Sequence, residues 1–148
     1  MTLRENAGIV TGEDADDLLA WLRGLDGCPP VTHTVLTSCS RHGDEQPTWS
    51  YVEADARDGV ARRRCVACGG ASALLDSAER WTFPPMWSCR SCAQSLAEVA
   101  AGISTDSDDT SRATWLALAA RCVECGRIEG LTDVLVPGLP LDEVTAQL

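Results

Sequence analysis

Six of the eight cysteines in this 148-residue chain form pairs with two residues between them, a spacing typical of metal-binding knuckles. The spacing lets one tight turn aim both side chains at a single point. A glycine follows three of the four pairs and favours such a turn, because the chain there often needs a positive φ. A fourth pair has the same spacing with a histidine as its second member. The four pairs are Cys39/His42, Cys65/Cys68, Cys89/Cys92 and Cys122/Cys125.

Two such pairs supply the four ligands of a tetrahedral Zn²⁺, so the sequence predicts two structural zinc ions per chain. The 20 residues between the second and third pairs lie within the range typical of zinc sites. A disulfide framework, a thioredoxin-like redox pair and an iron–sulfur cluster fit the spacing less well. Cys28 and His33 are left over. We expect Cys28 to be a small buried residue and His33 to be a strand residue with its own hydrogen bonds.

The four pairs alternate in type, which predicts an internal duplication. The first pair stands in Ser-Cys-Ser-Arg-His and the third in Ser-Cys-Arg-Ser-Cys. The twelve residues that begin at Cys65 and the twelve that begin at Cys122 share six identities, including a valine, a leucine and an aspartate that zinc does not require. The copies would span 37–76 and 87–133. Convergence of short knuckles is the alternative explanation.

The knuckle sequences resemble a known class of zinc-binding proteins. Cys65-Val-Ala-Cys-Gly69, Cys122-Val-Glu-Cys-Gly126 and Cys89-Arg-Ser-Cys92 are similar to the knuckles of zinc-ribbon and treble-clef zinc fingers. The similarity covers roughly residues 37–136. It implies structural zinc and, in bacteria, a role beside the transcription or translation machinery.

Three pairings of the knuckles are open: tandem (first with second, third with fourth), nested (second with third, first with fourth) and cross-braced (first with third, second with fourth). We expect the nested pairing, because residues 93–102 have the pattern of a helix that ends in glycine. A ligand pair at a helix start is the treble-clef arrangement, and a helix N-terminus favours thiolates. The expected ligands are Cys65, Cys68, Cys89 and Cys92 for the first ion, and Cys39, His42, Cys122 and Cys125 for the second.

The hydrophobic pattern predicts an α+β fold, with short antiparallel strands around two zinc ions and two or three helices. We expect an N-terminal helix and connector over 1–30, a double zinc-binding domain over 31–136 and a C-terminal tail over 137–148. The expected helices cover 11–24, 93–102 and 141–148. The expected strands cover 31–37, 48–53, 60–65, 80–88 and 113–121, and an acidic loop covers 103–112.

The composition and motifs favour a binding protein over an enzyme. Complete four-ligand zinc sites leave no open position, and the sequence has no catalytic metal, nucleophile or phosphate-loop motif. The net charge of −10 argues against nucleic-acid binding and suits a protein partner with a basic surface. We therefore expect a non-catalytic, acidic adaptor for another macromolecule. Its candidate partner surface is Trp81, Phe83, Met86 and Trp87, although scarce aromatic residues also pack in cores.

Two alternative functions are a thiol-based redox or zinc-level sensor and a nucleic-acid-binding zinc-ribbon protein that uses the arginine run at 62–64. No apolar stretch is long enough to span a membrane, and no export signal begins the sequence, so we expect a cytoplasmic protein. The absence of lysine and the scarcity of other residues with AT-rich codons indicate a high-GC bacterium as the source.

Overall fold

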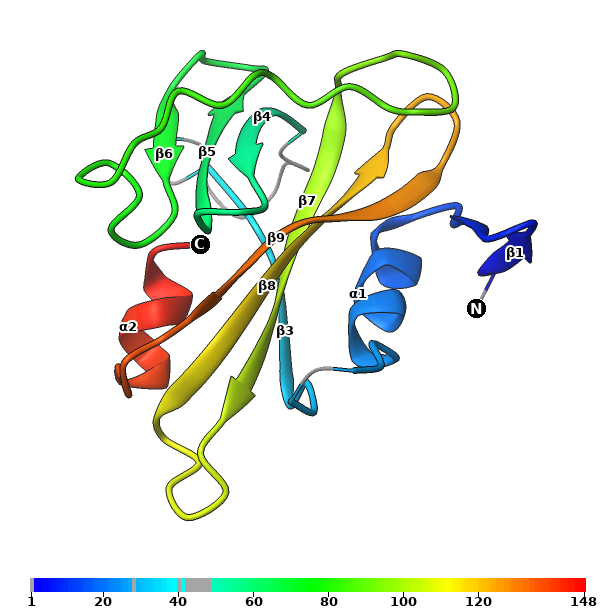
Figure 1. Ribbon diagram of the computed structural model, residues 1–148. Helices are drawn as coiled ribbons and strands as arrows, with labels where there is room; N and C mark the ends of the chain where they lie inside the picture. The colour runs from blue at the N-terminus through cyan, green and yellow to red at the C-terminus, as the bar shows by residue number, and fades with distance from the viewer. Residues whose placement is uncertain (1, 28, 40, 42–48) are drawn as a thin grey trace.

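The computed structural model describes every residue except 1, 28, 40 and 42–48. The described strands belong to one nine-stranded antiparallel sheet, and two short helices accompany them (Figure 1). The expected α+β fold of zinc-ribbon or treble-clef type is therefore wrong, and the protein is largely β. Within the described part of the chain, no helix is long and apolar enough to cross a membrane.

The elements are named in chain order, with the labels that Figure 1 uses. The strands are β1 (Arg4–Asn6), β2 (Ile9–Thr11), β3 (His33–Leu36), β4 (Ser50–Asp55), β5 (Val60–Cys65), β6 (Ala71–Ala73), β7 (Ala97–Thr105), β8 (Ala113–Cys122) and β9 (Arg127–Leu135). The helices are α1 (Ala15–Arg23) and α2 (Leu141–Ala146).

Several elements lie where the sequence predicts them. β5 has the predicted bounds, β8 forms over the stretch for which a strand is expected, and α2 forms in the tail. α1 begins later than predicted, because Asp14 and not Thr11 caps it. The Asp14 carboxylate accepts the main-chain N–H of Asp17 at 3.0 Å, which satisfies one of the free donors of the first turn.

The helix expected over 93–102 is wrong, because most of that stretch belongs to β7. Its alanines favour a helix locally, but β7 is a central strand that bonds to β8 on one edge and to β3 and β4 on the other. Both faces of β7 are buried, and burial overrides the local preference. The strand expected over 80–88 makes a single bridge in the described chain, Glu53 to Met86. The sequence pattern does not predict β1, β2, β6 or β9.

The sheet contains two three-stranded meanders, β4–β5–β6 and β7–β8–β9. In the described chain their first strands pair at one position, Ser50 opposite Ala97. Beyond this pair, β3 pairs with the same edge of β7. The β1–β2 hairpin extends the sheet on the other side, where β2 pairs with β9. The two halves of the sheet are therefore joined through very few ladder hydrogen bonds.

Different elements cover the two faces of the long strands (Figure 1). α1 packs on one face and buries Leu18 and Leu22 completely. Residues of β4, β5 and α2 pack on the other face and form the larger core. The end of β4 reaches across to β9, where the Thr132 hydroxyl donates to the carbonyl of Asp55 at 3.0 Å. The first meander thus folds over the second as a second layer.

The buried carboxylate of Asp17 ties the start of the chain to α1. It accepts hydrogen bonds from the Thr2 hydroxyl and from the main-chain N–H groups of Thr2 (3.0 Å) and Glu13 (2.7 Å). These bonds, that of the Thr2 hydroxyl first, lower the pKa of Asp17 from 3.8 to about 2. The charged form is the favoured one, so the stabilisation is present above pH 3.8 and is lost as the pH falls toward 2.

Leu116→Ala tests whether the larger core stabilises the sheet. Leu116 is fully buried in β8, so we expect its truncation to lower the free energy of unfolding by about 2 to 5 kcal/mol. Leu135→Ala is the matched control, because Leu135 is 80% exposed on the neighbouring strand and should change stability by less than about 0.5 kcal/mol. Urea denaturation of the metal-loaded protein measures both. Equal effects of the two substitutions would contradict this description of the core.

Candidate metal centres

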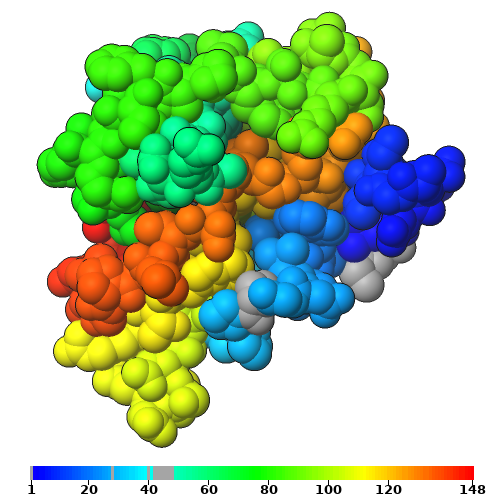
Figure 2. Space-filling model, in the orientation of Figure 1, coloured from blue at the N-terminus to red at the C-terminus, as the bar shows by residue number. Residues whose placement is uncertain are grey.

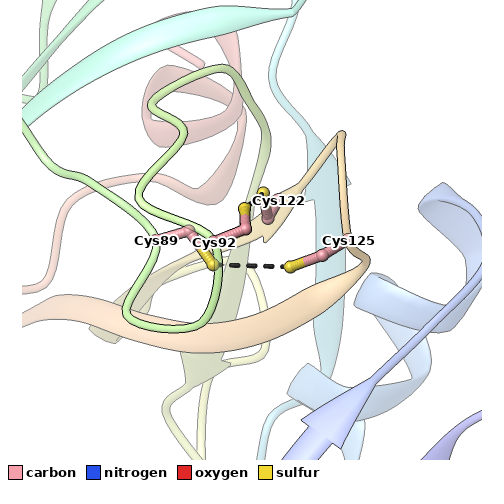
Figure 3. A group of neighbouring side chains, drawn as sticks. All are labelled: Cys89, Cys92, Cys122 and Cys125. Carbon is pink, nitrogen blue, oxygen red and sulfur yellow. Dashed lines mark hydrogen bonds between the residues drawn. The ribbon is translucent and has the colours of Figure 1, made fainter.

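Four cysteines from two knuckles meet at one end of the second meander (Figure 3). Cys89 and Cys92 come from the loop before β7, Cys122 is the last residue of β8, and Cys125 stands in the turn before β9. Their four sulfur atoms lie within 4.8 Å of one another. Two of the distances are 3.5 Å, Cys89 to Cys125 and Cys92 to Cys122. We call these four residues the four-cysteine group.

These distances suit a metal ion and not a disulfide. A zinc–thiolate bond of about 2.3 Å gives a tetrahedron whose sulfur–sulfur edges are roughly 3.8 Å, whereas a disulfide bond is about 2.05 Å long. The seven described cysteines are all free thiols. The disulfide alternative therefore finds no support in the described chain, and the four-cysteine group has the dimensions of a metal site.

The turn after Cys89 aims main-chain N–H groups at its sulfur. Ser91 donates to it at 3.4 Å. Burial raises the pKa of the Cys89 thiol, but the N–H groups of Cys92 and Ser91 outweigh burial and lower it. Burial and the neighbouring thiols raise the pKa of Cys125 to about 12. Four thiolates this close together need a cation among them, and a bound divalent cation removes their protons.

A second group contains Cys39, Cys65 and Cys68, whose sulfur atoms also lie within 4.8 Å of one another. The sulfur atoms of Cys39 and Cys68 are 3.7 Å apart, and the main-chain N–H of Gly70 donates to the Cys68 sulfur at 3.4 Å. Burial raises the pKa of Cys65, but the N–H groups of its own turn outweigh burial and lower it to about 7. These residues, the three-cysteine group, can therefore also hold a metal ion.

The knuckles combine in tandem, and this grouping replaces the nested one expected from the sequence. The first pair contributes Cys39 to the group of the second pair, and the third pair joins the fourth. The nested arrangement depended on a helix after Cys92, but a strand follows instead. Because β7 and β8 form a hairpin that starts at the third pair and ends at the fourth, these two pairs meet within one meander.

The same connections surround both groups. Cys65 stands opposite Ser50, the first residue of β4, and Cys122 stands opposite Ala97, the first residue of β7. The residue after each of these cysteines donates its main-chain N–H to the residue just before the neighbouring strand. Val66 donates to the carbonyl of Trp49 and Val123 to the carbonyl of Leu96, at 3.1 Å in both cases. The predicted duplication over 37–76 and 87–133 stays a prediction, with this recurrence as its geometric counterpart.

Three sequence-predicted residues are not part of either group as described. His42 and Cys28 lie outside the described residues. His33 is exposed on β3, and its Nδ1 lies 2.9 Å from the hydroxyl of Thr32. His33 thus has a local polar contact, as expected for a strand residue with its own hydrogen bonds.

Glu129 of β9 interacts with three polar side chains beside the four-cysteine group. Its carboxylate accepts the indole N–H of Trp87 at 2.7 Å and lies 3.7 Å from Arg90 and 3.9 Å from Arg127. Arg127 also donates to the Ser91 hydroxyl at 2.9 Å, inside the turn of the third pair. Glu129 thereby fixes the orientation of this knuckle against β9. Sequence reasoning does not identify it, because a glutamate on an unpredicted strand carries no signal.

Of the four candidate partner residues, two tryptophans make contacts within the protein, and Phe83 and Met86 are exposed. The guanidinium carbon of Arg62 lies 4.4 Å from the centre of the Trp81 ring, and Trp87 packs against the larger core. Phe83 is 85% exposed and Met86 is 52% exposed. Phe83 also has a φ of 56°, a sparsely populated region for a bulky residue. The segment from Trp81 to Trp87 is therefore partly core and partly free surface.

The arginine run at 62–64 binds its own chain. Each guanidinium donates to an acceptor inside the protein, which leaves fewer donors for phosphate groups. The acceptors are the Glu53 carboxylate for Arg62 (2.8 Å), the main-chain oxygens of Ser38 and Leu148 for Arg63 (2.8 Å to Leu148), and the main-chain oxygen of Gly69 for Arg64 (3.0 Å). The run therefore has a structural use in this fold.

Fold and site together define a largely β protein with two cysteine groups that can each hold a metal ion. In the comparisons with known proteins, no family model, no curated protein and no solved structure matches the chain.

The metal content of cysteine variants tests the tandem grouping. Replacing Cys89 and Cys92 by serine should remove one metal ion, because tetrahedral binding needs both pairs of the group. Adding Cys122→Ser and Cys125→Ser should remove no further ion, since the same site is already lost. Native mass spectrometry counts the ions, and Cys28→Ser is the matched control that should keep them all. Loss of a second ion from the fourfold variant, with circular dichroism like that of the double variant, would contradict the tandem grouping and favour the nested or the cross-braced one.

Proposed function

We propose that the protein is a non-catalytic adaptor held together by two structural zinc ions. The observation that carries this proposal is the four-cysteine group, with its sulfur–sulfur distances of 3.5 Å. An all-thiolate, tetrahedral ligand set suits Zn²⁺. Four protein ligands also leave no coordination position for water or substrate, so the ion in this group has a structural role.

The second ion belongs with the three-cysteine group. Its three sulfur atoms leave one tetrahedral position for a further ligand. His42, which shares a knuckle with Cys39 and which the sequence predicts as a zinc ligand together with Cys39, Cys122 and Cys125, would be the fourth ligand here instead. With an imidazole there, this site also has four protein ligands and no catalytic opening.

Removal of zinc should unfold the protein. A structural zinc ion contributes about 10 to 16 kcal/mol in small fingers, against a typical total stability of about 5 to 15 kcal/mol. We expect a strong chelator to abolish the β-sheet circular dichroism and added zinc to restore it. The control is the same chelator saturated with zinc beforehand. A native-like spectrum of the metal-free protein would refute the structural role.

The adaptor role rests on the exposed residues of the segment from Trp81 to Trp87. Phe83 and Met86 protrude between Trp81 and Trp87, whose contacts anchor the main chain on both sides of them. Exposed aromatic residues of this kind are typical anchors of protein interfaces. The net charge of −10 suits a partner with a basic face around an apolar pocket.

Phe83→Ala should weaken binding of the partner by about 2 kcal/mol or more, which is roughly 30-fold in Kd. The partner is first identified by crosslinking in the native host, and its affinity is then measured by calorimetry with purified proteins. Leu135→Ala, which truncates an equally exposed side chain outside the segment, is the control. Unchanged affinity for the folded Phe83→Ala protein would remove this segment from the proposal.

A further inference from the structure

A crevice of about 280 Å³ opens between the C-terminal end of α1 and strands β8 and β9. Figure 2 shows this side of the molecule, where blue α1 meets orange β9. Two tryptophans from different elements, Trp21 of α1 and Trp115 of β8, line the crevice together with Leu25. Two exposed carboxylates, Asp26 and Asp133, also line it. It contains neither cysteine group and no residue of the segment from Trp81 to Trp87.

A glycine and an irregularity of strand pairing lie at the floor of this crevice. The register between β8 and β9 shifts beside Gly130, so that Leu118 pairs with Thr132 and the next residue pairs with Gly130. A Cβ atom on Gly130 would meet only the tip of the Trp21 ring, at 3.8 Å. Bulges and strand glycines often mark places where a ligand approaches the backbone closely.

The charges around the crevice favour a cation. Asp26 follows the C-terminal end of α1, and a helix C-terminus carries partial negative charge. One oxygen of Asp133 accepts the indole N–H of Trp115 at 3.0 Å, which holds both groups in place. Arg23, in the last turn of α1, donates to Thr34 at 2.9 Å and does not line the crevice. Among the described residues that line it, none is basic.

We propose that this crevice binds an alkylated ammonium group. Such a cation has a large apolar surface and a diffuse charge, so it loses little hydration in a mostly apolar site and is attracted to indole rings. The nearby carboxylates add a long-range attraction without direct hydrogen bonds. An unmodified ammonium would have to give up its hydration shell for rings that cannot accept its hydrogen bonds fully. This proposal is independent of the zinc and adaptor proposals.

Nuclear magnetic resonance of the ¹⁵N-labelled, zinc-loaded protein tests the proposal through the indole N–H signals of Trp21 and Trp115. The probes are tetramethylammonium chloride and a short peptide with one trimethyllysine. A third probe is the same peptide with carbon in place of the quaternary nitrogen, which keeps the shape and removes the charge. We expect saturable shifts with a cationic probe and binding of the neutral peptide that is about tenfold weaker.

Substitutions of crevice residues test whether the cationic probes bind in this crevice. Asp26→Asn should weaken binding about threefold, because Asp26 is exposed and its charge is partly screened. Trp21→Ala should weaken it about tenfold. Asp16→Asn, which removes an equally exposed charge from the first turn of α1, is the matched control and should have no effect. Because Trp21→Ala also removes packing against the sheet, Asp26→Asn keeps the test valid if the tryptophan variant fails to fold.

The outcomes are distinct. Shifts with the peptide alone support the proposal and identify a protein side chain as the ligand, whereas shifts with both cationic probes support it for a small molecule as well. Equal binding of the cationic and neutral peptides would overturn it, because the crevice would then be merely apolar. Absence of shifts with every probe, or full binding by the folded Asp26→Asn and Trp21→Ala proteins, would also overturn it.

Discussion

In the described chain, the strand ladders of the two meanders are joined at a single residue pair, and the two cysteine groups stand on either side of that pair. Cys65 lies opposite Ser50, Ser50 opposite Ala97, and Ala97 opposite Cys122, so the four residues form one row across four strands. The hydroxyl of Ser50 is fully buried and has no hydrogen-bond partner among the described residues. A net hydrogen bond contributes only about 1 kcal/mol, so this joint is weak by itself. Metal ions bound on both sides of it would fix the strand ends that the ladder does not hold.

The grouping of the ligands follows from the same arrangement. Each meander begins after one knuckle and carries the other knuckle at the turn between its second and third strands. A hairpin therefore brings the two knuckles of a meander together, without help from the rest of the chain. The nested alternative would close its second site across the 79 residues between His42 and Cys122, and the cross-braced alternative would span 46 and 53 residues, at a greater cost in entropy. Two local sites on one sheet are thus the simpler solution for this topology.

The sequence identifies the chemistry of the site better than the fold around it. Spacing alone picks out every cysteine of the two groups, because a two-residue gap has few uses other than a turn that aims two ligands at one point. It does not reveal that Ala97–Thr105 is a strand, since its alanines favour a helix until the neighbours that bury both of its faces are known. For the same reason the grouping of the knuckles is not predictable, because it depends on which strands pair. Glu129 escapes sequence reasoning because only the folded chain brings it to Trp87 and the third knuckle.

The segment from Trp81 to Trp87 keeps an exposed side chain in a position that the core does not need. Phe83 has a positive φ, a conformation that costs about 1 to 3 kcal/mol for a non-glycine residue, and its ring contributes little buried surface in return. Contacts on both sides compensate for this cost: Arg62 stacks on Trp81, and Trp87 is bonded to Glu129 beside the four-cysteine group. Because Glu129 also lies near Arg90 of the third knuckle, the geometry of the metal site and the position of Phe83 are linked through one carboxylate. Loss of an ion from the four-cysteine group would then disturb the exposed segment through Glu129, and it would also disturb the start of α1, because the N–H of Gly12 donates to the carbonyl of Gly126 in the fourth knuckle at 2.9 Å.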